Sequence, residues 1–263
     1  MPASLPTPAA PAQDETRSVL AIPAFRKLWN SMVFSSLGDW LGLLATTALA
    51  QQLSGGSYAT ANFAIAGVFI ARLLPAVFLG PIAGVIADRL DRRKLMVTAD
   101  IFRAGLYISI PIVNTYFWLY AAMILVECLT LFWSPAKEAT VPNLVGKDKL
   151  ESANQASLLA AYGTAPVAAI LFSFLTLFAS AIESLFPFSI GTSVDIALYA
   201  NAATFAFAAF TIWGLKEIPR GAAADKAKDE NIWKSLNDGW KSVSETRLIR
   251  GRIVGMIGAF SAA

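Results

Sequence analysis

The chain has 263 residues, of which 56% are hydrophobic and 15% are charged, and its formal net charge is +3. Soluble domains carry about 25% charged residues, so this composition argues against a soluble globular protein. The sequence contains no histidine and a single cysteine, Cys128. This excludes histidine-based metal sites, serine–histidine–aspartate hydrolysis and an intrachain disulfide bond.

Six apolar runs are long enough to cross a bilayer as helices, which takes about 20 residues. In chain order they are Leu28–Leu53, Ala59–Ala87, Leu95–Val113, Tyr116–Ala136, Ala156–Ile182 and Ile196–Leu215. They have almost no polar stripe, whereas a helix of a soluble bundle needs one. The sequence therefore predicts an all-α, multi-pass membrane protein whose bundle of six transmembrane helices occupies residues 28–215.

Three segments lie outside this predicted bundle. Residues 1–27, rich in Pro and Ala at their start, are expected to be a disordered cytoplasmic tail. Residues 216–252 are expected to be a cytoplasmic linker. Apolar residues in it recur at spacings of three and four, which predicts an amphipathic helix on the membrane surface or packed on protein: Trp233, Leu236, Trp240 and Val243.

Residues 253–263 begin a new apolar run that is too short to span a bilayer. We expect this run to be the start of a truncated seventh transmembrane helix, so that the chain is a fragment. A re-entrant or surface-lying tail is the alternative.

The basic residues outside the spans all fall on one side of the predicted membrane. The loops on the other side, Ser54–Tyr58, Asn114–Thr115 and Glu183–Asp195, contain neither Lys nor Arg. Cytoplasmic loops are the ones that hold Lys and Arg, so we expect a cytoplasmic N-terminus in a plasma (inner) membrane protein. Because the basic residues are dispersed over short loops, a nucleic acid is not an expected partner.

A charge-rich segment, Gly84–Lys94, lies between the second and third spans. Its spacing resembles the G-x-x-x-D-R-x-G-R-R loop of the major facilitator superfamily of secondary transporters, with Asp91 in place of the second glycine. In that family the loop forms a charge relay that latches the two halves of the transporter in the outward-open state. The resemblance implies a latch role for five residues: Gly84, Asp88, Arg89, Arg92 and Arg93.

Other segments resemble the branch of that superfamily that contains macrolide and siderophore exporters. They are Phe25–Trp29 leading into Ser36–Trp40, Ala99–Ala104, and Ser134–Val145 followed by Ala153–Asn154. The resemblance implies one six-helix half of a twelve-helix fold, built from two inverted three-helix repeats. The partner that it implies is the missing C-terminal half of the same transporter.

Five ionisable residues fall within the spans: Asp39, Arg72, Asp100, Arg103 and Glu127. Each costs at least about 2.5–3.5 kcal/mol at the centre of a bilayer if it is unpaired, so such residues normally face a cavity or a partner. Asp100 and Arg103 are spaced i, i+3 near the inner edge, and we interpret them as a structural ion pair.

The other three lie near the middle of the membrane, where a burial-tuned carboxylate can couple transport to protons. Asp39 and Glu127 are therefore candidate proton-coupling residues, and Arg72 is a candidate counter-charge or contact for an anionic substrate. The alternative is a static ion-paired network. For helix packing, the candidates are Gly80, which begins a small-xxx-small pattern, and Pro166, in a relaxed form of the superfamily's antiporter motif.

These observations predict a proton-coupled secondary exporter of amphipathic small molecules, of the drug, macrolide or siderophore type, working in the lipid bilayer by alternating access. No G-x-x-x-x-G-K-[ST] loop occurs, so the chain is expected to have no ATP-binding phosphate cradle of its own. No cofactor or metal is expected, and the absence of histidine and the single cysteine, Cys128, argue against an enzyme. The alternatives are a lysophospholipid transporter or flippase of the same fold, a membrane-embedded enzyme, and a partner subunit that does not itself transport.

Overall fold

The computed structural model describes residues 19–185 and 192–218, except for the side chains of residues 81, 82, 85, 88 and 182–185. Most of the expected N-terminal tail, nearly all of the linker with its amphipathic helix, and the apolar run 253–263 lie outside the described residues. The predictions made for those segments therefore stay predictions.

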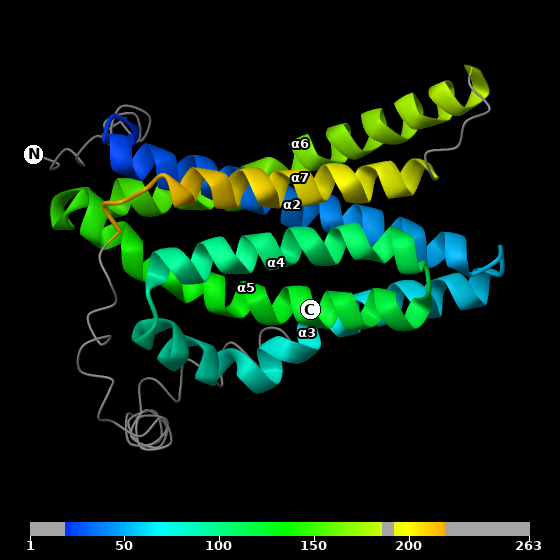
Figure 1. The fold of residues 1–263 in the computed structure, drawn as a ribbon, viewed down its shortest axis with the longest axis horizontal. Coiled ribbons are helices and arrows are strands. Elements are labelled where there is room, and N and C mark those ends of the chain that lie inside the picture. Colours follow the sequence, from blue (N-terminus) through cyan, green and yellow to red (C-terminus); the bar gives the residue numbers. More distant parts are fainter. Residues whose placement is uncertain (1–18, 186–191, 219–263) are drawn as a thin grey trace, which may run out of the picture.

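The described residues form six long helices joined by short connections, and they contain no β-strand (Figure 1). The helices are α2 (Pro23–Leu53), α3 (Tyr58–Arg89), α4 (Arg92–Val113), α5 (Tyr116–Val145), α6 (Leu150–Leu185) and α7 (Ser193–Trp213). Each contains a stretch that is long and apolar enough to cross a membrane. The predicted fold class is thus confirmed.

The fourth helix is longer than the sequence pattern predicted. Helix α5 continues past Ala136 to Val145, although Pro135 and Pro142 lie within it. Burial of Val141 and Val145 in the core holds this extra part in place, and Thr140 Oγ1 donates to the Ala136 carbonyl at 2.7 Å. Lys137, which the sequence placed in a loop after the span, therefore lies on the helix.

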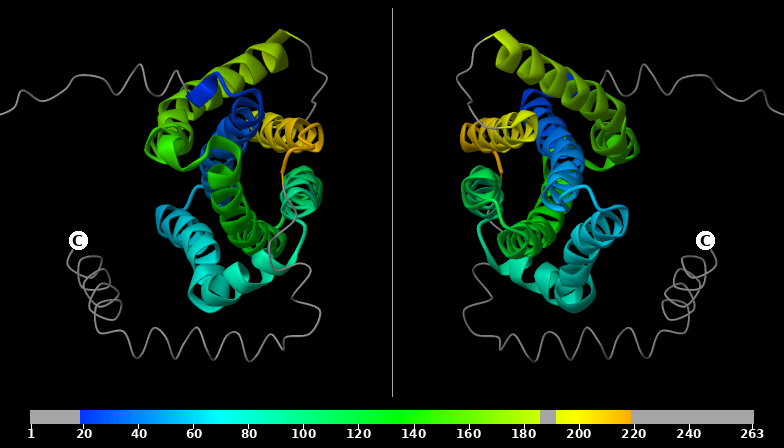
Figure 2. Two further views of the ribbon diagram at one scale, coloured as in Figure 1. Left: turned by 90° about the vertical axis from the view of Figure 1, so that its left-hand side faces the viewer. Right: turned by 90° about the vertical axis from the view of Figure 1, so that its right-hand side faces the viewer.

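Four of the helices form a ring. Seen end-on in Figure 2, α2, α7, α4 and α5 follow one another around it, with α6 outside α2 and α3 outside α5. The first three helices correspond in order to the last three: α2 to α5, α3 to α6 and α4 to α7. The packing pairs correspond in the same way, so that α6 packs on α2 as α3 packs on α5. This correspondence is what two inverted three-helix repeats produce.

The core consists of two clusters of buried side chains, one in each half of the bundle. One contains Phe25, Met96 and Ile212, and the other contains Leu49, Ile110 and Leu119. The buried polar residues Ser35, Asp100 and Arg103 lie between the two clusters along their helices.

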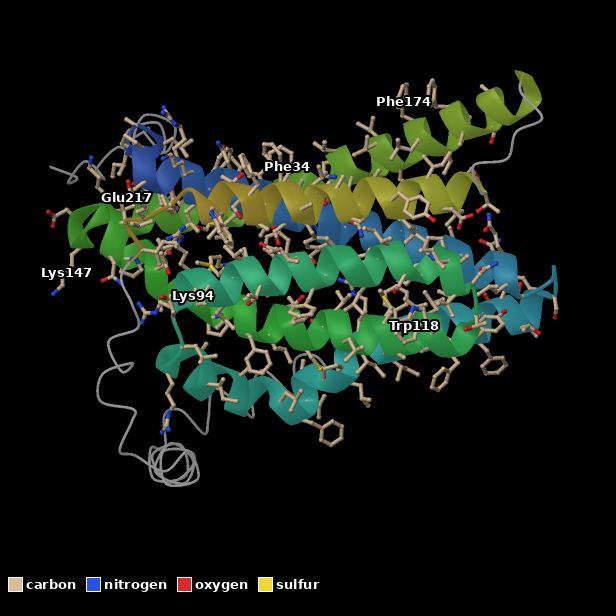
Figure 3. All side chains as sticks on the ribbon, viewed as in Figure 1. Phe34, Lys94, Trp118, Lys147, Phe174 and Glu217 are labelled. Atoms are coloured by element: carbon tan, nitrogen blue, oxygen red, sulfur yellow. The ribbon has the colours of Figure 1, made fainter. Side chains whose placement is uncertain are left out.

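The outer helices α3 and α6 leave large apolar faces exposed. Among the exposed side chains are Phe63, Ile70 and Val77 on α3 and Ile170, Phe174 and Leu177 on α6. Figure 3 shows Phe174 projecting from the outer side of α6, whereas the labelled charged residues Lys94, Lys147 and Glu217 gather at the opposite end of the molecule. Apolar flanks and one charged end are the arrangement expected of a bundle in a bilayer.

Candidate functional site

A hollow of about 370 Å³ opens between α2, α3 and α6. Asp39 and Trp40 of α2, Phe69 and Arg72 of α3, and Tyr162 of α6 line it. At about 1.5 Å per residue, Asp39 lies about 24 Å along the helix axis from Pro23, and Arg72 lies about 26 Å from Arg89. The hollow therefore combines a carboxyl group, a guanidinium group and aromatic rings near the middle of the helices.

The backbone holds Arg72 in the hollow without a close carboxylate. Its Nη1 donates to the main-chain carbonyl of Asp39 at 3.4 Å. Among the described residues, no carboxylate oxygen lies within 4.0 Å of its guanidinium. Glu127, half-buried on α5, is within electrostatic range of Arg72, Asp39 and Arg103 but forms no ion pair within that distance in the described part of the chain.

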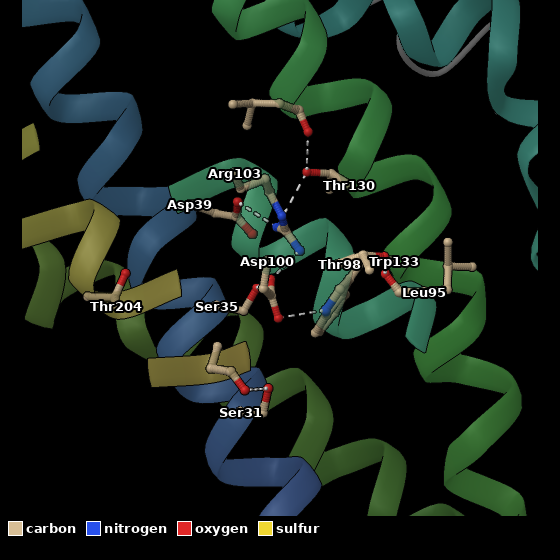
Figure 4. A network of polar contacts seen from close by, with 12 residues as sticks. Ser31, Ser35, Asp39, Leu95, Thr98, Asp100, Arg103, Thr130, Trp133 and Thr204 are labelled. Atoms are coloured by element: carbon tan, nitrogen blue, oxygen red, sulfur yellow. Dashed lines mark hydrogen bonds and ion pairs between the residues drawn. The ribbon is translucent and has the colours of Figure 1, made fainter. Parts of the chain in front are cut away.

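Behind the hollow, Arg103 of α4 joins the two carboxylates that the sequence analysis treated separately (Figure 4). Its Nη2 lies 2.7 Å from Asp100 Oδ1, and its Nη1 lies 3.6 Å from Asp39 Oδ1. The side chains of Arg103 and Asp100 are fully buried, whereas that of Asp39 is 32% exposed. The expected i, i+3 contact is present, and it is part of a larger network that reaches the hollow.

Neighbouring polar and aromatic groups complete this network. Trp133 Nε1 donates to Asp100 Oδ2 at 3.1 Å, and Ser35 Oγ lies 3.5 Å from Asp100 Oδ1. The guanidinium of Arg103 lies 4.7 Å from the ring centre of Phe205 and 5.4 Å from that of Trp133. Ring faces attract a desolvated cation, so these contacts help to stabilise its charge inside the bundle.

Trp133, Ser35 and Phe205 belong to the site although no sequence pattern predicted them. In the sequence they are a Trp, a Ser and a Phe within apolar spans, where such residues are common. Their roles follow from helix packing, because they come from α5, α2 and α7 and meet around a residue of α4.

Two glycines of α2 allow the helices around this network to approach closely. A Cβ atom on Gly42 would lie 2.4 Å from Tyr107 Oη and 2.8 Å from Asn201 Nδ2, and one on Gly38 would lie 2.5 Å from Thr204 Oγ1. Real Cβ atoms essentially never come this close to a neighbour, so side chains at either position would push α4 or α7 away.

The start of α4 contacts two other helices. Arg92 Nη1 donates to the Ala139 carbonyl of α5 at 3.0 Å, and Arg93 donates to the carbonyl of Trp213 at the end of α7. Asp91 Oδ1 accepts a hydrogen bond from Lys94 N at 3.0 Å and so caps the start of α4. An N-cap is a role in which Asp is favoured, which gives a physical reason for Asp91 at the position of the motif's second glycine.

The remaining predicted residues lie on the outer helices. Arg89 is half-buried at the end of α3, and the side chain of Asp88 is outside the described residues. A Cβ atom on Gly80 or Gly84 would meet nothing within 4 Å among the described residues, and Pro166 is exposed on α6. The close helix approach expected at Gly80 and the latch role of the loop remain predictions.

The chain matches the family described as transmembrane secretion effector over residues 15–263. It is 32% identical over 126 residues to the uncharacterized MFS-type transporter YfiS of Bacillus subtilis, a segment covering 48% of this chain and 29% of that protein. It is 25% identical over 238 residues to the putative bacilysin exporter BacE of Bacillus subtilis, a segment covering 89% of this chain and 54% of that protein. The chain is 33% identical over 109 residues to macrolide efflux protein A of Enterococcus faecalis, a segment covering 38% of this chain and 34% of that protein.

The matched segments thus cover about half or less of the length of these relatives.

Proposed function

Because this chain belongs to the transmembrane secretion effector family of the major facilitator superfamily, we propose that it forms half of a secondary exporter for amphipathic small molecules of the drug, macrolide or siderophore type. The observation that carries this proposal is the hollow that contains Asp39 and Arg72. Aromatic and apolar side chains there suit the apolar body of a cargo, and the two charges suit its polar groups.

Alternating access requires one bundle to rock against another around a central site. The exposed apolar faces of α3 and α6, on either side of the ring, supply a surface for a second bundle. The matched segments cover only 29% to 54% of the length of these relatives, which supports the same proposal. The missing C-terminal half would then cover the hollow from the other side.

We assign proton coupling to Asp39, with Glu127 as a second carboxylate. Asp39 is the only member of the Arg103 network with a side chain that both contacts Arg103 and lines the hollow. Protonation of Asp39 would leave Asp100 as the one carboxylate paired with Arg103 among the described residues. The charge state of the hollow and the helix contacts around Arg103 would then change together. Coupling of this kind is what links an ion gradient to a conformational change.

The test is gradient-driven uptake of a fluorescent amphipathic drug into inverted vesicles that contain the full gene product. Asp39→Asn keeps the side-chain volume but cannot carry a proton, so we expect it to abolish uptake at near-normal expression. Glu127→Gln should have a milder effect. Asp148→Asn, an exposed carboxylate near the start of α6, is the matched control and should behave like the parent.

Uptake by the Asp39→Asn variant at the parent's rate, with unchanged pH dependence, would show that Asp39 is structural. A lysophospholipid transporter of the same fold is separated by a second assay. In reconstituted vesicles it would move labelled lysophospholipid across the bilayer, whereas the drug would stay outside.

A further inference from the structure

A second and larger hollow, of about 620 Å³, opens between α5 and α6. Polar side chains line part of it, namely Ser134, Lys137 and Glu138 of α5 and Asn154 and Ser157 of α6. At about 1.5 Å per residue, Lys137 lies about 12 Å from the end of α5 at Val145, much nearer the charged end of the bundle than Arg72.

The two hollows adjoin each other along α6. Ala161 and Tyr162 line both of them, and the side chain of Tyr162 is exposed between them. The two hollows therefore lie next to each other along α6, and a ligand that moved from one to the other would pass Tyr162.

The ammonium group of Lys137 has no tight partner. Its side chain is only 18% exposed, and the nearest carboxylate oxygen, Glu138 Oε1, is 4.0 Å away on a side chain that is 72% exposed. The ring of Trp133 lies 5.9 Å from Nζ, and no acceptor among the described residues is within hydrogen-bond distance. Solvent screens the exposed carboxylate more than the buried ammonium, so the cation dominates inside this hollow.

Arg72 presents the same situation in the first hollow. Among the described residues, its guanidinium donates only to a main-chain carbonyl, at 3.4 Å, and the nearby carboxylate of Asp39 lies 3.6 Å from Arg103 instead. Among the described residues, each hollow thus holds a half-buried cation with no carboxylate oxygen closer than 4.0 Å. An arginine or lysine in this state is ready to bind an anionic group of a ligand.

We propose that the hollow between α5 and α6 is a capture site for the anionic group of the cargo, that Lys137 binds this group, and that Arg72 receives it in the Asp39 hollow. The inference rests on the export function proposed above and specifies its substrate class as amphipathic organic monoanions. The apolar part of the cargo would lie against Val141, Leu150 and Leu158, which line the same hollow.

The test uses two probes that differ only in charge, dansyl-labelled undecanoic acid and its carboxamide. The full gene product is reconstituted in phosphatidylcholine vesicles, and gradient-driven uptake of each probe is measured. We expect Lys137→Gln to raise KM for the acid about tenfold, the factor that corresponds to losing one charge-assisted hydrogen bond. Uptake of the carboxamide should not change.

Arg72→Gln should impair uptake of the acid as well, and Lys137→Arg should keep most of it because it preserves the charge. Lys147→Gln is the control, since Lys147 is exposed at the same end of the bundle outside both hollows. Its kinetics should match those of the parent for both probes.

An equal loss of uptake of both probes in the Lys137→Gln variant would overturn the capture site. Uptake of the drug but not of the acid by the parent would do the same. The proposed export function would survive either result. Failure of the parent to move the drug and both probes would instead overturn export itself. A Lys137→Gln effect that appears only when phosphatidylglycerol is added would assign Lys137 to a lipid headgroup and also reject the proposal.

Discussion

Arg103 Nη1 lies 3.6 Å from Asp39 Oδ1, and this contact ties α4 to α2 across the centre of the ring. The same guanidinium lies 2.7 Å from Asp100 Oδ1 on its own helix. One fully buried cation therefore serves two carboxylates, one of them buried and one open to the hollow. Arg103 therefore has a structural role in holding α2 and α4 together and a proposed functional role in the charge state of the hollow. Separate experiments can distinguish the two roles.

The structural consequence is tested by Arg103→Gln. Removing one partner of a buried ion pair leaves the other charge unpaired, which typically costs about 3–5 kcal/mol. We therefore expect the variant to unfold at a clearly lower temperature in detergent than the parent. The double variant Arg103→Gln/Asp100→Asn should recover part of this loss because it removes both charges.

Lys94→Gln, a change to an exposed cation at the start of the same helix, serves as the control and should melt like the parent. An Arg103→Gln variant as stable as the parent would show that the network contributes little to folding.

A second prediction concerns the close packing around Gly42. Gly42→Ala places a methyl group 2.4 Å from Tyr107 Oη, so the side chains of Tyr107 and Asn201, or the helices that carry them, must shift. Overpacking of this kind typically costs about 1–3 kcal/mol. Gly105→Ala is the matched control, because a Cβ there meets nothing within 4 Å. This variant should have the same free energy of unfolding as the parent or one higher by up to about 1 kcal/mol, because Ala has a higher helix propensity than Gly. Equal melting temperatures for the two variants would contradict the packing described here.

A third prediction concerns the first turn of α4. Arg93 donates to the carbonyl of Trp213, and a cation at a helix C-terminus contributes about 0.3–1 kcal/mol. Arg93→Ala should therefore loosen the last turn of α7, measured as faster deuterium uptake of its backbone amides. Lys94→Ala should leave that uptake unchanged, because the hydrogen bond from Lys94 to Asp91 uses its main-chain N–H, which the substitution keeps. Equal uptake in the two variants would mean that Arg93 does not anchor α7.

A fourth prediction concerns orientation in the membrane. The connection between α2 and α3 and the connection between α5 and α6 lie at opposite ends of the bundle, and Ser57 and Asp148 are exposed there. In a Cys128→Ser background, Ser57→Cys should react with an impermeant thiol reagent added to intact cells. Asp148→Cys should react only after the membrane is opened. The reverse pattern would place the N-terminus outside.

The sequence by itself determined the number and type of the spans and the asymmetry of their charges. Twenty or more consecutive apolar residues suit a membrane helix wherever they occur, and the Lys-free and Arg-free loops need no tertiary information. Local spacing was also enough to pair Asp100 with Arg103, because residues three apart are neighbours on a helix.

Only the tertiary structure decided which of these charges act together. Arg103 meets Asp39 because α4 and α2 lie on opposite sides of a ring that closes through α7, a relationship that no spacing within one helix encodes. Lys137 belongs to a hollow because α5 continues beyond the predicted span, through Pro142 to Val145, with Val141 and Val145 buried in the core. Contacts between segments distant in the chain depend on how helices pack, and packing depends on the shapes of all the partners at once.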